Sequence, residues 1–177
     1  MKNAGKIALG GIITSLSVII MFLGGIIPEA NYAFPAAAGI LLMIIAIEID
    51  SRWAFMVFLA VSGLSMLVLY SREAGVFYTA FFGHYPIIKG FLERLKPKIL
   101  TWIVKYLVFN LCVVTAFWLV LSVFGIKVDG TNELGRYTMY ILWGVGNAAF
   151  VIYDLALSSI ERVYMSSLHP HLKRLVK

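Results

Sequence analysis

Ionisable side chains interrupt the apolar segments of this chain at a few positions. Lys105 and Asp154 each lie inside an apolar run, and His84 lies in another. A charged group within a membrane span is costly, so it usually pairs with another group or marks a pathway. We keep two interpretations open: Lys105 and Asp154 form a structural ion pair, or Lys105 and His84 lie along a transport pathway. His84 could contact a ligand, relay a proton or bond a backbone carbonyl.

Two embedded asparagines, Asn110 and Asn147, could likewise have a structural role or a role in transport. They could bond each other or a neighbouring helix, or they could contact a solute. Tyr140, Trp143 and Asn147 are spaced i, i+3, i+7, which places them on one face of a helix. Tyr and Trp on that face could stack on a flat solute, or they could belong to an interfacial aromatic belt.

Motifs of common catalytic sites are missing from the sequence. There is no Walker A motif, Gly-x-Ser-x-Gly elbow or His-Glu-x-x-His pair. His169 and His171 make at best a weak metal site, and a single cysteine, Cys112, excludes an internal disulfide. We expect Cys112 to be a small buried hydrophobic residue. The sequence therefore predicts no enzyme, no catalytic residue, no cofactor and no metal.

Composition places the chain in a membrane. Hydrophobic residues make up 61% of its 177 residues and charged residues only 14%, against roughly 25% charged in soluble domains. The formal net charge is +6, but the cations lie beside apolar runs. That pattern favours contact with membrane lipid rather than nucleic acid. We predict a bacterial plasma (inner) membrane protein.

The apolar runs predict an all-α, polytopic helical bundle that forms one membrane domain, 1–177. A spanning helix needs about 20 mostly apolar residues. Six runs qualify approximately, and the last could continue as a cytoplasmic helix to Ser167. We expect spans over 7–27, 33–49, 53–70, 74–92, 99–126 and 134–160.

The cations support six spans with both termini cytoplasmic. Of the 15 Lys and Arg residues, that topology puts eleven on the inner side and three on the outer, with Lys105 inside a span. Cytoplasmic loops are expected to be enriched in Lys and Arg. We also expect Glu48 and Asp50 to lie at the inner water boundary.

The segment FFGHYPIIKGFLERLKPKIL, residues 81–100, makes the fourth span unusual. Pro86 cannot donate a helical hydrogen bond, so the carbonyl of Phe82 is freed and lipid cannot satisfy it. This segment must therefore face protein or a wet cavity. Lys89 lies near the inner end, where we expect its ammonium to extend to the lipid headgroups. The residues ERLKPK form a cytoplasmic turn.

The first span carries a small-residue face. Ala4 and Ala8 are four apart, as are Gly11 and Ser15, and such residues let helices approach closely. The face could pack within this chain's own bundle or against a partner.

With the basic N-terminus, KIALGGIITSLSVII and six short-looped spans, the chain resembles the substrate-binding membrane subunit, or S-component, of energy-coupling-factor transporters. The resemblance implies capture of a vitamin-like small organic solute from outside, with PEANYAF helping to close over it. It implies a transmembrane coupling subunit that docks on Ala4, Ala8, Gly11 and Ser15, and two ATPase subunits. The implied solute-binding residues are Asn31, Tyr32, Tyr78, His84, Trp118, Tyr140, Trp143 and Asn147.

Two other functions remain open. A non-catalytic scaffold subunit of an envelope complex would use the small-residue faces and basic loops to hold partners, and its aromatic residues would pack internally. A small stand-alone permease would instead transport solute into liposomes without ATP or partners.

Overall fold

A computed structural model describes residues 3–24, 32–69, 72–124 and 133–168 of the chain. Every regular element among these residues is a helix, and no strand occurs in them. The all-α prediction is therefore confirmed for the described part of the chain.

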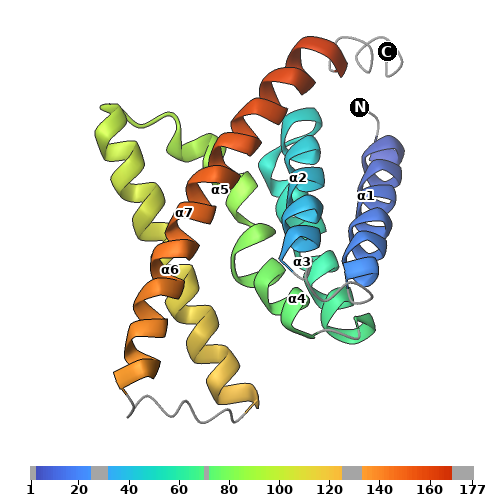
Figure 1. Cartoon of the computed structure of the whole chain (residues 1–177). Helices are drawn as coiled ribbons and strands as arrows, with labels where there is room; N and C mark the ends of the chain where they lie inside the picture. The colour runs from blue at the N-terminus through green and yellow to red at the C-terminus, as the bar shows by residue number, and fades with distance from the viewer. Residues whose placement is uncertain (1–2, 25–31, 70–71, 125–132, 169–177) are drawn as a thin grey trace.

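The first three helices form one block in which each helix runs antiparallel to the one before it (Figure 1). They are α1 (Asn3–Gly24), α2 (Ala33–Glu48) and α3 (Ser51–Val68). Asp50, in the tight turn between α2 and α3, is the N-cap of α3. Its carboxylate accepts a 2.8 Å hydrogen bond from the backbone N–H of Trp53. This side-chain cap satisfies one of the free N–H groups at the start of α3.

The expected fourth span, 74–92, is divided into three pieces. They are α4 (Arg72–Phe77), the π-helix η2 (Tyr78–Phe82) and α5 (Tyr85–Leu92). The backbone N–H of Gly83 donates to the carbonyl of Tyr78 over 2.7 Å, which is the i→i+5 bond of a π turn. The break lies just before Pro86, at the position where the sequence predicts a freed carbonyl.

Two long helices complete the chain, α6 (Lys98–Phe124) and α7 (Glu133–Val163), and the short π-helix η3 (Tyr164–Leu168) continues α7. Figure 1 shows α6 and α7 crossing, with α7 reaching from the crossing back over the block of α1 to α5. Two regions of the molecule are thus joined: a compact block and a crossed pair.

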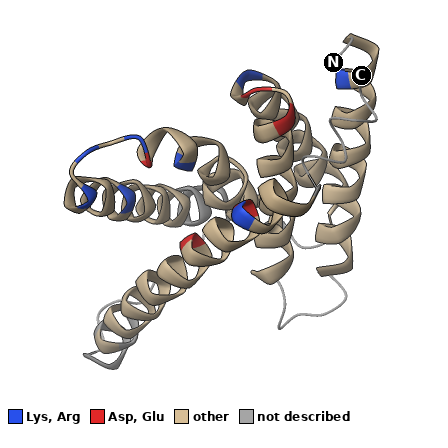
Figure 2. Cartoon of the chain, turned by 90° about the horizontal axis from the view of Figure 1, so that it is seen from above, with Lys and Arg blue, Asp and Glu red and all other residues tan. Residues whose placement is uncertain are grey.

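Four helical stretches are long and apolar enough to cross a membrane: Asn3–Gly24, Ser51–Val68, Lys98–Trp118 and Tyr140–Ser167. The helix α2 is apolar but shorter. Charged residues occupy only short pieces of the ribbon in Figure 2. Large hydrophobic side chains such as Ile12, Leu67 and Leu111 are exposed on the outside, as expected for surfaces that face lipid. These helices make the chain a membrane-embedded protein.

The core has two parts. A mainly aliphatic cluster fills the block of α1 to α5, with Met21, Leu42 and Val61 fully buried. An aromatic cluster joins that block to α6 and α7, and in it the rings of Phe109 and Phe150 stack at 4.6 Å. Aromatic pairs of this kind contribute about 0.5–1.5 kcal/mol beyond their buried area.

Candidate functional site

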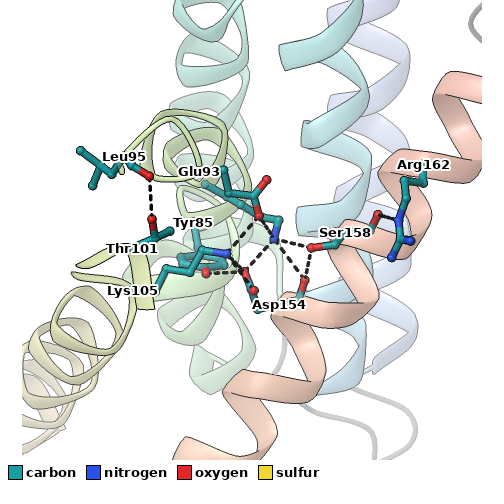
Figure 3. Close-up of polar contacts among 9 residues, drawn as sticks. Tyr85, Glu93, Leu95, Thr101, Lys105, Asp154, Ser158 and Arg162 are labelled. Carbon is teal, nitrogen blue, oxygen red and sulfur yellow. Dashed lines mark hydrogen bonds and ion pairs between the residues drawn. The ribbon is translucent and has the colours of Figure 1, made fainter. Parts of the chain in front are cut away.

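A group of charged residues, three of them buried, lies where α5, α6 and α7 meet (Figure 3). The helix α5 supplies Tyr85 and Lys89, which are four residues apart and so share a face, and Glu93 follows directly after it. Lys105 comes from α6 and Asp154 from α7. We call Lys89, Glu93, Lys105 and Asp154 the ion cluster.

Asp154 is the centre of the ion cluster. Its Oδ1 lies 2.8 Å from Lys89 Nζ, and its Oδ2 lies 2.8 Å from Lys105 Nζ. The hydroxyl of Tyr85 donates a 2.7 Å hydrogen bond to Oδ1. Each carboxylate oxygen therefore has at least one charged partner. The interpretation of Lys105 and Asp154 as an ion pair is confirmed.

Glu93 bridges the two lysines. Its Oε1 lies 2.6 Å from Lys89 Nζ and 3.0 Å from Lys105 Nζ. Burial, the largest influence, raises the pKa of Glu93, but the hydrogen bonds and charges of the two lysines outweigh it. The net result is a pKa of Glu93 below its ordinary value. Glu93 thus stays ionised at neutral pH.

The cluster is electrically balanced, with two ammonium groups and two carboxylates. Lys89, Lys105 and Asp154 expose only 1%, 4% and 2% of their surface, whereas the side chain of Glu93 is 39% exposed. Buried charges are tolerated when they are paired and hydrogen-bonded. Glu93 is consequently the member of the ion cluster whose side chain can be reached from outside the helices.

The donors of Lys89 are saturated by the protein itself. Its ammonium has three protons and contacts Glu93 Oε1, Asp154 Oδ1 and, at 2.7 Å, Ser158 Oγ. It also lies 3.2 Å from the backbone carbonyl of Asp154. An ammonium surrounded in this way has no donor left for a solute. The role of Lys89 is therefore structural: it holds α5 against α7.

The expectation that Lys89 extends to the lipid headgroups is wrong. Its side chain turns inward, because Asp154 and Ser158 lie on the facing helix and offer stronger partners than the interface. Sequence analysis missed Lys89 and Glu93 as members of the cluster. A signal was present: Tyr85, Lys89 and Glu93 recur at intervals of four residues, which is the spacing of one helix face.

The carbonyl of Phe82 faces protein, as the position of Pro86 predicts. The hydroxyl of Tyr153, on α7, lies 3.5 Å from it and also 3.5 Å from the carbonyl of Ala36. Tyr85 and Pro86 are themselves buried. The prediction that this segment faces protein is confirmed for residues 81–87, which are all buried or half-buried.

His84 lies between a backbone carbonyl and the single cysteine. Its Nδ1 is 3.3 Å from the carbonyl oxygen of Thr79, and its Nε2 is 3.4 Å from Cys112 Sγ. A carbonyl can only accept, so Nδ1 is the donor to Thr79, and in a neutral ring Nε2 then accepts from the thiol. Of the roles considered for His84, the bond to a backbone carbonyl is therefore present. Cys112 is half-buried and contacts His84.

The two embedded asparagines bond each other. Asn110 Nδ2 donates to Asn147 Oδ1 over 3.0 Å, which links α6 to α7. Each amide also donates to a carbonyl one turn earlier, that of Tyr106 for Asn110 and that of Trp143 for Asn147. The structural role considered for this pair is thus present.

The other residues implied by the resemblance lie in different environments. Trp118, Tyr140 and Trp143 are exposed on α6 and α7. Tyr32 packs edge-on against Phe77, with ring centroids 4.9 Å apart. Tyr78 is fully buried, and its hydroxyl has no hydrogen-bond partner. Asn31 lies outside the described residues.

The small-residue face of α1 points away from the block. Ala4, Ala8, Gly11 and Ser15 are all exposed, whereas Gly10 is buried on the opposite face. A Cβ placed at Gly10 would lie 3.3 Å from Val57, but one at Gly11 would meet nothing within 4 Å. Among the described residues, therefore, nothing packs closely on this face, which favours the alternative of a partner.

The hydroxyl of Tyr164, on η3, donates a 2.7 Å hydrogen bond to Glu48 Oε1, at the end of α2. In the residues described, no group of three His, Cys, Asp or Glu side chains could hold a metal ion. Comparisons with protein-family models, curated proteins and solved structures found no match to this chain.

Proposed function

We propose that this chain is the solute-capturing membrane subunit of a multi-subunit transporter. In this proposal it crosses a bacterial plasma membrane six times with both termini cytoplasmic, and it takes up a small, vitamin-like organic molecule. A transmembrane coupling subunit docks on α1, and two ATPase subunits provide the energy. The chain itself performs no catalysis.

The observation that carries the proposal is the division of α1 into two small-residue faces. One face, with Gly10, Ser17 and Gly24, is buried against α2 and α3. The other, with Ala4, Ala8, Gly11 and Ser15, is exposed. Small residues let helices approach closely in a membrane, so the exposed face is suited to a partner helix.

The aromatic residues of α6 and α7 support the solute-binding part. Trp118, Tyr140 and Trp143 are exposed, and the Asn110–Asn147 pair lies one turn away from Trp143. Aromatic rings beside amide groups are a usual lining for organic solutes. In the proposed topology these residues lie in the outer half of the membrane.

A purification from the native host in mild detergent tests both parts at once. Native mass spectrometry then measures the proteins and small molecules that stay bound. We compare wild type with Gly11→Leu and, as a matched control, Gly144→Leu. Both glycines are in helices, and a Cβ at either meets nothing within 4 Å, so both variants should fold.

We expect wild type to retain a coupling subunit with ATPases, which supports docking, and a vitamin-sized mass, which supports capture. Overpacking a close contact costs about 1–3 kcal/mol, so Gly11→Leu should reduce partner recovery about tenfold. Gly144→Leu should leave it unchanged. Equal recovery for all three chains would refute docking through the exposed face of α1, and a chain that retains no solute would refute capture.

A scaffold subunit of an envelope complex is the second candidate. The full burial of Tyr78 and the internal packing of Phe81, Tyr85 and Phe150 favour it, because a scaffold needs aromatic residues for its core rather than for a solute. In the same experiment it predicts bound envelope-assembly proteins, still sensitive to Gly11→Leu, and no retained small molecule.

A further inference from the structure

The turn between α5 and α6 carries three exposed cations, Arg94, Lys96 and Lys98. Its acidic residue, Glu93, is directed into the ion cluster, where it contacts Lys89 and Lys105 (Figure 3). The negative charge of Glu93 therefore balances buried lysines. The turn is left with more uncompensated positive charge than its sequence, ERLKPK, suggests.

The ion pairs among the described residues involve none of these three cations. Arg94 lies over the ring of Phe91, 5.5 Å from its centroid, and this contact leaves the N–H groups at the guanidinium edge available. Cations that are exposed, close in sequence and unneutralised attract anionic groups.

An apolar track begins directly beside the cations. Ile99, Ile103 and Leu107 follow at intervals of four residues, so they share one face of α6. They are 73%, 57% and 61% exposed. A ligand that combines a negative headgroup with a hydrocarbon chain matches both features together.

Aromatic residues mark the depth at which headgroup and chain would meet. Trp102 and Tyr106 lie on the first turns of α6, each 36% exposed, with ring centroids 6.1 Å apart. Trp and Tyr are enriched at the membrane–water interface. The cations then lie on the water side of the aromatic residues, at the level of the lipid phosphates, and the apolar track runs past these rings towards the level of the acyl chains.

We propose that this surface, formed by the turn 93–98 and the first three turns of α6, binds an anionic phospholipid. Arg94, Lys96 and Lys98 contact the phosphate and the acidic headgroup, and an acyl chain lies along Ile99, Ile103 and Leu107. A zwitterionic lipid has no net negative charge to offer, and free phosphate has no chain. The proposal does not depend on solute capture or on docking through α1.

The test uses the full chain, delipidated in a neutral detergent and titrated with phosphatidylglycerol or with phosphatidylcholine of the same acyl chains. Native mass spectrometry counts the bound lipids. The variant Lys96→Gln/Lys98→Gln is compared with Arg52→Gln/Arg162→Gln, which removes two exposed cations elsewhere. Thermal unfolding confirms that both variants are folded.

We expect wild type to bind phosphatidylglycerol in preference to phosphatidylcholine. Each cation removed from the turn should lower the affinity about fivefold, and the control variant should bind like wild type. Equal binding of the two lipids, or an equal loss in the control, would overturn the proposal. Displacement of the lipid by glycerol phosphate at the same concentration would also overturn it, because a soluble phosphate would then be the ligand.

Discussion

Asp154 shows how a single buried residue can depend on several others. Two lysines and the Tyr85 hydroxyl surround its carboxylate, and Glu93 holds the same two lysines from the other side. Removing one partner of a buried pair leaves an uncompensated charge, which is more costly than removing a balanced pair. The stability of the cluster is therefore set by its charge balance.

Lys89→Met tests this balance. The change leaves Asp154 and Glu93 to share Lys105, so the cluster becomes net negative, and we expect destabilisation by about 3–5 kcal/mol. Lys89→Met/Glu93→Gln retains the neutral Lys105–Asp154 pair and should be less destabilised than the single variant. Reversible unfolding in detergent measures both free energies. Arg52→Met, at an exposed cation, serves as the control and should change little.

A double variant at least as unstable as Lys89→Met would contradict this account, because it would mean that charge balance does not govern the cluster.

At this scale the sequence predicts some contacts and not others. The Lys105–Asp154 pair is predictable because both charges lie deep in apolar runs, where each needs a partner. The position of Lys89 is not, because a lysine near the end of a span can reach either the interface or the interior. Only the tertiary arrangement, which places Asp154 and Ser158 opposite it, decides between the two.

Among the elements, the divided fourth segment is the one whose form the sequence only partly reveals. Pro86 predicts a freed carbonyl that needs a protein partner, but the expected single span over 74–92 is instead divided into α4, η2 and α5. The partner, Tyr153, lies 71 residues away in the chain, and no local pattern predicts it. The π-helix before the break also has no clear sequence signal.

The glycine at position 39 makes the close approach of α2 to this segment possible. A Cβ there would overlap the carbonyl oxygen of Phe82 and would lie 2.8 Å from the hydroxyl of Tyr153. Gly39→Ala should therefore push η2 and α2 apart and weaken the Tyr153 contact, with a cost of about 1–3 kcal/mol.

Thermal unfolding of the purified chain measures the effect of Gly39→Ala. Gly63→Ala is the matched control, because Gly63 is also in an apolar helix and a Cβ there meets nothing within 4 Å. That control should be neutral or slightly stabilising, since alanine favours helices. An unchanged melting temperature for Gly39→Ala would show that α2 and η2 separate without cost.

For the whole molecule, the ion cluster and the aromatic cluster fasten the crossed pair of α6 and α7 to the block of α1 to α5. Composition and hydropathy are sufficient to predict a helical membrane protein, because only 14% of the residues are charged, too few to cover a surface that faces water. They are not sufficient for the number of crossings, since the fourth segment is broken and α2 is short.

Labelling of single cysteines tests the number of crossings directly. In a Cys112→Ala background, we place one cysteine at Asn3, Tyr32 or Leu95, which are all exposed. In Figure 1 the start of α1 and the turn after α5 lie at one end, and the start of α2 lies at the other. With six crossings and cytoplasmic termini, an impermeant maleimide should label only the Tyr32→Cys chain in intact cells. The other two should react after permeabilisation. Labelling of Leu95→Cys in intact cells, with Asn3→Cys unlabelled, would contradict the four crossings expected before residue 95, and so the six-span topology.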